Sequence, residues 1–207
     1  MSFKIIMMSC DEYKCLTPAF NHCMDKYYPN HPDIEYIYGN EEWTKRLRKK
    51  LETMTDEYVL FILDDMLIRE PVKKDLIESA LNTLRNDTSV AVINFEKNYR
   101  EAKEYSENWF EQKQGQMYLH SCQPSIWRRT ALIENLSKDE TPWAWELTRV
   151  NNNWKYLINK DTEIINVGRT NDLNWGISRS KMTNEFKNFL KSENIYLDEI
   201  KEVFECS

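Results

Sequence analysis

Residues 58–66, YVLFILDDM, decide the fold of this chain. Apolar residues fill positions 58–63 without alternating with polar ones, and two aspartates, Asp64 and Asp65, follow at once. A continuous apolar run of this kind is typical of a central strand that is covered on both faces of a sheet. The sequence therefore predicts a buried strand with a pair of carboxyl groups at its carboxyl end.

Three further apolar segments, at 3–8, 34–38 and 89–95, have the composition of strands. Between the strands, apolar residues recur at spacings of three and four, which is typical of one helix face. Pro71 is expected to open the third of these helices. Alternating strands and helices predict an α/β fold, with a mostly parallel sheet and helices on both faces. The apolar helix positions are Leu16, Phe20 and Met24; Trp43, Leu47, Leu51 and Met54; Val72, Leu76, Ala80, Leu81 and Leu84.

The second half of the chain has weaker periodicity, and no linker or repeat divides it from the first. Its polar stretches are longer, and a long polar connection is typical of a functional loop. The expected elements are a surface excursion over 96–116, a strand over 117–121, a helix over 125–136, a helical turn from Thr141, strands over 155–158 and 162–167, and two helices beyond Met182.

Composition excludes several classes of protein. The 207 residues are 41% hydrophobic and 30% charged, which is typical of a folded globule and not of a disordered chain. Because there are only 4 glycines, a glycine-rich phosphate loop is not expected. The net charge of −6 argues against a protein that binds nucleic acid through bulk electrostatics.

The sequence also bears on where the protein works. No run approaches the roughly 20 apolar residues of a membrane span. The 5 cysteines lack the paired spacing of a zinc site, and they are expected to be free thiols. Free thiols are typical of a reducing compartment, so we expect a cytoplasmic protein without an integral membrane segment.

The aspartate pair is the first candidate for chemistry. In open α/β sheets, ligands bind outside the carboxyl ends of the strands. Two adjacent anions repel each other, and they need a cation, hydrogen bonds or a proton to be stabilised. A hard divalent ion with oxygen ligands answers that need. The alternative is that one aspartate caps the following turn and the other is solvated.

The second candidate combines aromatic and polar residues over 118–129, YLHSCQPSIWRR, and 140–146, ETPWAWE. Aromatic walls with a few polar groups suit a sugar or a nucleobase, because ring faces stack while hydroxyl groups are hydrogen-bonded. The alternative is that the tryptophans are core residues and Glu146 is a carboxylate favoured near a helix start. A third group, Arg46, Lys49 and Lys50, either neutralises phosphates or forms a solvated helix face.

The order of these features resembles the small bacterial and viral glycosyltransferases of the GT-A fold, over residues 3–175. The motifs that carry the resemblance are LDD at 63–65, Gln-x-x-x-Trp at 123–127 and Pro-Trp-x-x-Glu at 142–146. Members of this family transfer sugars from nucleotide-activated donors. The resemblance implies a single GT-A-like domain over 1–207, with a nucleotide-sugar-binding half over 1–95, an acceptor half over 96–176 and C-terminal helices over 177–207.

The resemblance also implies roles for individual residues. The aspartates stand where the family has an Asp-x-Asp motif, although here they are adjacent, and Asp65 with Asp64 is the implied ligand of Mg²⁺ or Mn²⁺. Glu146 is the implied general base of an inverting reaction, and Asp65 acts with it in catalysis. The implied donor-binding residues are Ser9, Cys10, Asp11, Tyr13, Arg46, Asp64 and Arg169, and the implied acceptor-binding residues are His120, Gln123, Trp127, Trp143 and Trp145.

The resulting expectation is a glycosyltransferase, monomeric or homodimeric, that uses a nucleotide sugar, first of all a UDP-sugar. Its acceptor is a hydroxyl group of a surface glycan or of a hydroxylated base in phage DNA. Two other functions stay open. One is a metal-dependent nucleotidyl or phosphoryl transferase, in which the aspartates hold metal ions for attack on phosphorus. The other is a nucleotide-sugar-binding module without catalysis.

Overall fold

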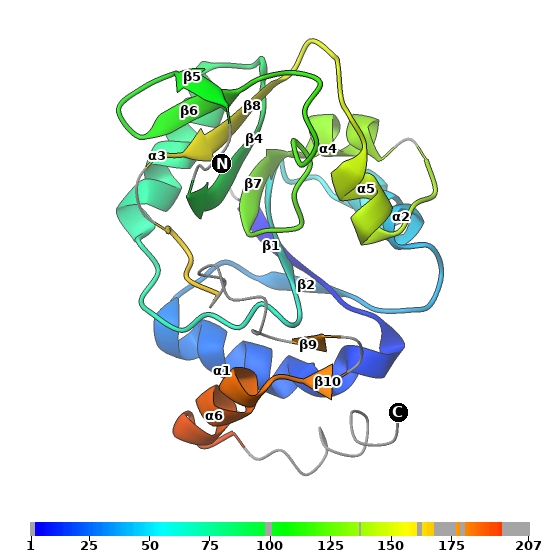
Figure 1. Cartoon of the computed structure of the whole chain (residues 1–207), viewed down its shortest axis with the longest axis vertical. Coiled ribbons are helices and arrows are strands. Elements are labelled where there is room, and N and C mark those ends of the chain that lie inside the picture. Colours follow the sequence, from blue (N-terminus) through cyan, green and yellow to red (C-terminus); the bar gives the residue numbers. More distant parts are fainter. Residues whose placement is uncertain are drawn as a thin grey trace.

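The structure is a computed structural model that describes residues 3–97, 101–136, 138–160, 163–167, 177–178 and 181–195. Its centre is one eight-stranded sheet in the order β2-β1-β3-β7-β4-β8-β6-β5, and β9 and β10 form a separate pair (Figure 1). The strands are β1 (Phe3–Met8), β2 (Ile34–Ile37), β3 (Tyr58–Leu63), β4 (Val90–Lys97), β5 (Ala102–Glu104), β6 (Trp109–Gln112), β7 (Ser125–Arg128), β8 (Lys155–Asn159), β9 (Ile177–Ser178) and β10 (Lys181–Met182).

The predicted fold class is confirmed. β1 pairs in parallel with β2 and β3, and β4 pairs in parallel with β8. β7 lies antiparallel between β3 and β4, and β6 lies antiparallel between β8 and β5. All strands of the large sheet except β6 and β7 therefore point the same way. The molecule has a mixed α/β fold built on a mostly parallel sheet.

Helices cover both faces of this sheet (Figure 1). Side chains of α1, α3 and α6 join one buried apolar cluster, and side chains of α2, α4 and α5 join the other. The helices are the 3₁₀ helix η1 (Asp11–Leu16), α1 (Thr17–Tyr27), α2 (Trp43–Thr53), α3 (Lys74–Asn86), α4 (Arg129–Asn135), α5 (Pro142–Leu147) and α6 (Asn184–Ser192).

β3 and the second half of β1 are apolar because both faces of these strands are covered. On β1, Ile5 and Met7 belong to the cluster under α1, whereas Ile6 and Met8 belong to the cluster under α2. None of these four side chains is more than 1% exposed. The continuous apolar run of β3 has the same cause. The residues after Leu63 lie just beyond the carboxyl end of this strand.

The segment 96–116 is not the predicted surface excursion. It completes β4 and supplies β5 and β6, which extend the sheet beyond β8. Trp109 is fully buried there, and its Nε1 donates a hydrogen bond to Oγ1 of Thr83 at 3.1 Å. β5 has 3 residues and β6 has 4, so neither is long enough for a clear alternation in the sequence.

The predicted strand over 117–121 is also wrong. The chain turns there, and Tyr118 has a φ of +62°. The strand in this region is β7, and α4 begins directly after it at Arg129. The first four residues of the predicted helix over 125–136 are extended because β7 forms ladders with β3 and β4 at once.

Three smaller predictions meet different outcomes. α3 begins at Lys74 rather than Pro71, because Val72 N–H donates to the Tyr27 carbonyl (2.9 Å) before the helix starts. Residues 163–167 form no strand, and the second closing helix, beyond residue 195, lies outside the described residues. Over the described ranges, every helix is too short or too polar to cross a membrane.

Candidate functional site

A cavity of about 580 Å³ lies at the carboxyl ends of β1 and β3. Four segments form its walls: the end of β1 with the start of η1, the loop after β2 with the first turn of α2, the end of β3 with the residues after it, and the start of α5. These segments are far apart in the sequence and meet because their strands are neighbours in the sheet. The predicted site residues that line the cavity are Ser9, Cys10, Tyr13, Arg46, Asp64, Asp65 and Trp143.

Asp64 is fixed by the ladder between β1 and β3. Its backbone N–H donates to the carbonyl of Met8 at 3.2 Å, so the pairing of the two strands continues one residue beyond β3. The side chain is buried, and its Oδ2 accepts a hydrogen bond from Oγ of Ser9 at 2.5 Å. Burial, with the neighbouring charge of Asp65, raises the pKa of Asp64 to about 7. A cation bound beside this carboxyl group would favour its charged form.

Arg46 is the basic residue that the cavity wall contains. Its Nη1 donates to the carbonyl of Ser9 at 2.6 Å, and its Nε donates to the carbonyl of Glu41 at 3.0 Å. Burial lowers the pKa of the guanidinium group, and nearby acids work against that effect. Arg46 therefore links the turn after β1 to the loop after β2.

The other basic residues of α2 do not form a phosphate-binding face. Lys49 is paired with Glu41 at 2.9 Å, and Lys50 is paired with Glu35 at 2.7 Å. These pairs are at the surface, where each contributes little to stability. Of the three basic residues predicted as a group, only Arg46 lines the cavity.

The cavity is strongly acidic. Among the described residues, its walls carry five carboxyl side chains and the guanidinium group of Arg46, and one of these carboxyl groups, that of Glu41, is paired with Lys49 outside the cavity. These carboxyl groups repel a diphosphate, and a bound cation would offset that repulsion. The five carboxyl groups are those of Glu12, Glu41, Glu42, Asp64 and Asp65.

Asp64 and Asp65 suit a hard divalent cation as a partial site. They supply carboxylate oxygens, which such ions prefer, and they stand in an acidic cavity. In the described part of the chain, no group of three His, Cys, Asp or Glu side chains is arranged to hold a metal ion. The remaining ligands of a cation at this place would have to come from a bound diphosphate and from water.

The predicted helical turn that holds Glu146 is confirmed as α5. Oγ1 of Thr141 caps it by accepting from the N–H of Ala144 at 3.2 Å, and Pro142 occupies the first turn. Trp143 is 73% exposed at the cavity rim. Glu146 is half-buried one turn further on, and its Oε1 accepts from the N–H of Cys122 at 2.7 Å. Glu146 does not itself line the cavity, but it stands on the helix that forms one of its walls.

Four of the predicted acceptor residues lie in the interior. Trp127 and Trp145 are 0% and 1% exposed, and His120 and Gln123 are 2% and 5% exposed. His120 stacks on Trp145 with 4.7 Å between ring centroids, and its Nε2 is 2.9 Å from Oδ1 of Asn135. Burial lowers the pKa of His120 to about 4. His120 and Trp127 pack against Trp145 of α5, and Trp143 is the predicted acceptor residue on the cavity wall.

The structure does not place two of the predicted donor residues on the cavity wall: one lines no part of it, and the other is not described. Asp11 starts η1 and is exposed, whereas its neighbour Glu12 lines the cavity. Arg169 lies outside the described residues.

Sequence reasoning missed the loop after β2. Gly39, Asn40, Glu41 and Glu42 all line the cavity. Gly39 has a φ of +121°, and a Cβ atom there would stand 3.3 Å from Cδ of Arg46. The pair Gly39-Asn40 marks the end of a strand, but nothing in it indicates that the loop returns to a site formed by β1 and β3.

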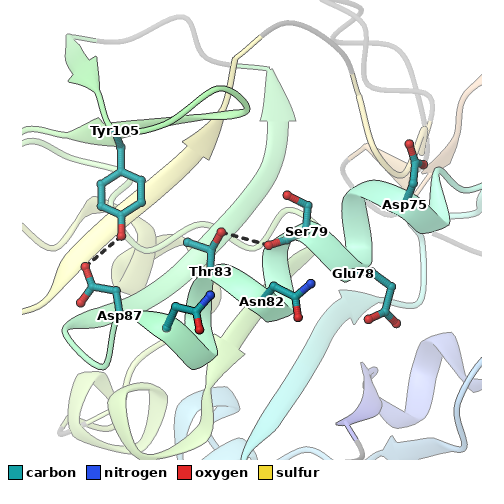
Figure 2. Close-up of a pocket in the computed structure, with 8 residues that line it drawn as sticks. Asp75, Glu78, Ser79, Asn82, Thr83, Asp87 and Tyr105 are labelled. Carbon is teal, nitrogen blue, oxygen red and sulfur yellow. Dashed lines mark hydrogen bonds between the residues drawn. The ribbon is translucent and has the colours of Figure 1, made fainter.

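A second cavity, of about 520 Å³, runs along α3 (Figure 2). Polar residues of α3, among them Asp75, Glu78 and Asn82, form one wall, and Tyr105 closes one end by donating to Oδ2 of Asp87 at 2.8 Å. Asp87 is also paired with Lys155 at 2.7 Å, so its charge is already balanced. This cavity contains none of the predicted site residues.

Comparison with known proteins finds solved structures that match this chain with low sequence identity and low TM-scores. No protein-family model matches the chain, and no curated protein matches it. Solved structures that match include the bifunctional IspDF from Campylobacter jejuni, with 13% identity, a TM-score of 0.40, and 67% of this chain and 44% of that chain covered. Another is residues 1–349 of S. aureus TarS in complex with UDP-GlcNAc, with 13% identity, a TM-score of 0.39, and 94% and 66% covered.

A third matching structure is a CMP:2-keto-3-deoxy-manno-octonic acid synthetase complexed with CTP. It has 12% identity and a TM-score of 0.37, and the match covers 70% of this chain and 82% of that chain. The chain thus spans less than half of IspDF and about two thirds of the TarS fragment. At this level of similarity, the matches assign neither a family nor a function to the chain.

Proposed function

We propose that the chain is a glycosyltransferase that moves a sugar from a nucleotide-sugar donor to a hydroxyl group, with its donor site in the cavity at the ends of β1 and β3. One observation carries the proposal: Asp64 and Asp65 open into the same cavity as the turn after β1 and the start of α5. The cavity volume of about 580 Å³ is within the range of small-molecule sites. Its position outside the carboxyl ends of parallel strands is where α/β sheets bind ligands.

The donor is held by the walls described above. Ser9, Cys10 and Tyr13 line the side of the cavity that would receive the base and ribose, and a UDP-sugar is the first candidate. Asp65, together with Asp64, would hold Mg²⁺ or Mn²⁺. When bound, such an ion offsets the negative charge that builds on the leaving diphosphate. The acidic walls support this arrangement, because a cation bound with the diphosphate offsets the repulsion between the diphosphate and the carboxyl groups.

The reaction needs one base. The acceptor oxygen forms a bond to the anomeric carbon while the bond from that carbon to the diphosphate oxygen breaks, and the diphosphate leaves with the electron pair. The acceptor proton passes to Glu146. Oε1 of Glu146 already accepts from the N–H of Cys122, which orients the carboxylate and leaves Oε2 for the acceptor. General bases of this kind contribute a factor of roughly 10²–10⁴ to the rate. With a single base, we expect inversion at the anomeric carbon.

The test is a panel of nucleotide sugars incubated with the protein and Mg²⁺ or Mn²⁺. We expect slow release of a nucleoside diphosphate, detected by chromatography, with one nucleotide preferred. We expect Asp65→Asn to abolish this release, whereas Asp25→Asn, an exposed aspartate on α1, should leave it unchanged. Cleavage at the α-phosphate would instead show nucleotidyl transfer, and stable binding without turnover would show a binding module.

A further inference from the structure

Exposed apolar side chains are concentrated beside the proposed donor site. Among the described residues, five large hydrophobic side chains are exposed, and four of them belong to α5 or to the segment just before β7. The fifth, Tyr36, is on β2. The four, which we name the α5 patch, are Met117 (41% exposed), Tyr118 (38%), Trp143 (73%) and Leu147 (48%).

The four residues belong to one region of the surface. Trp143 and Leu147 are four residues apart on α5, so they lie on the same helix face. The N–H of Tyr118 donates to the carbonyl of Glu146 at 2.8 Å, which places 117–118 against the end of α5. Trp143 also lines the donor cavity. The α5 patch therefore extends from the cavity rim, along the helix that carries Glu146, to the adjoining turn.

The charges around the α5 patch decide what can cover it. Among the described residues, the neighbouring cavity has five carboxyl groups, of which that of Glu41 is paired with Lys49, and one guanidinium group; Glu146 adds another carboxyl group on α5 itself. Arg149 follows the helix, and its Nη1 is directed to the carbonyl of Gly115 at 3.4 Å. A polyanion such as DNA, or an anionic lipid surface, would be repelled by this charge balance. An uncharged molecule would not be.

Aromatic and aliphatic side chains pack against the apolar faces of uncharged sugar rings, and nearby carboxylates accept hydrogen bonds from the sugar's hydroxyl groups. We infer that the α5 patch is the acceptor-binding surface and that the acceptor is an uncharged saccharide. The inference rests on the proposed function, and it selects a glycan over a base in DNA. Leu147 and Met117 would then contact the part of the acceptor that extends beyond the rim of the donor site, and so contribute to the choice of acceptor.

The experiment uses the full chain with Leu147→Ser and Met117→Ser, and with Tyr36→Ser as the matched control on β2. Binding of neutral oligosaccharides, of single- and double-stranded DNA with hydroxymethylated bases, and of phosphatidylglycerol vesicles is measured without donor by saturation-transfer NMR and sedimentation. Acceptor KM and acceptor-free donor hydrolysis are measured separately. We expect neutral oligosaccharides to bind, and each patch variant to raise the acceptor dissociation constant about fivefold. Donor hydrolysis and the control should be unchanged.

The outcomes separate the two proposals. Saccharide binding that depends on the α5 patch, with no turnover of any nucleotide sugar, would support a saccharide-binding surface at α5 and refute the proposed function. Binding of DNA or vesicles alone, binding of no probe, or saccharide binding that the patch variants leave unchanged would overturn the inference, and donor hydrolysis could still support the proposed function.

Discussion

Replacing Asp64 by asparagine should make the ligand-free protein more stable at alkaline pH. The carboxyl group is buried beside Asp65, and its pKa is raised from 3.8 to about 7. Asparagine has nearly the same shape, and its Oδ1 can still accept the hydrogen bond from Ser9. The substitution therefore removes a buried charge and leaves the packing in place.

The magnitude and its pH window follow from that pKa. Between pH 3.8 and about 7 the folded protein binds more protons at Asp64 than the unfolded chain does, so stability falls as pH rises through this window. Below the window the aspartate is neutral in both states, and the difference vanishes. Above it, the charged Asp64 destabilises the fold by about 4 kcal/mol relative to a neutral side chain, since one pKa unit corresponds to about 1.4 kcal/mol.

The assay is denaturant unfolding of both proteins at pH 4, 6 and 8 with a chelator present. We expect Asp64→Asn to raise the free energy of unfolding by about 4 kcal/mol at pH 8, by less at pH 6, and by well under about 1 kcal/mol at pH 4, near the foot of the window. Asp25→Asn serves as the surface control. An asparagine variant that is no more stable at pH 8 than at pH 4, relative to the parent, would refute the reasoning about this buried carboxyl group.

Three further predictions concern residues around the cavity. Glu146→Gln should retain donor binding, measured by calorimetry, while transfer to an acceptor falls by a factor of roughly 10² or more; unchanged transfer would place the base elsewhere. His120, with its pKa lowered from 6.5 to about 4 by burial, should stabilise the fold fully above pH 6.5 and lose about 3 kcal/mol as pH falls to 4. His120→Gln should flatten that part of the profile, and a parallel profile would contradict the assignment. Gly39→Ala should destabilise the protein by about 1–3 kcal/mol, because the backbone φ of +121° at Gly39 disfavours any side chain. The added Cβ should also displace Arg46 and so weaken donor binding. Thermal unfolding measures the first effect and donor titration the second, and a variant unchanged in both would argue against a strained loop.

The central sheet could be predicted because its signals are local. The apolar run of β3, the apolar strand β1 and the helix face with Leu47 and Leu51 each follow from the residues of one segment. The meeting of Asp64 with Ser9 follows from the same pattern, since parallel neighbouring strands end at one edge of the sheet.

The acceptor side could not be predicted in the same way. Trp143 and Trp145 are two residues apart in one short helix, yet one is 73% exposed and the other 1%. Composition cannot tell which of them faces a ligand, because the answer depends on how α5 packs over His120 and Trp127. For Lys49 and Lys50 of α2, the surface ion pairs favour the alternative of a solvated helix face over phosphate binding. Glu35, the partner of Lys50, is on β2 and is brought close by the fold, whereas Glu41, the partner of Lys49, is near it in the sequence, just before α2.

The most direct test of the donor site is a crystal structure of the chain grown with UDP and Mn²⁺. We predict that the nucleotide lies with Ser9 and Tyr13 on one side and the start of α2 on the other. We expect its diphosphate to be oriented toward Asp65. A nucleotide bound along α3, or no nucleotide at millimolar concentration, would contradict this prediction.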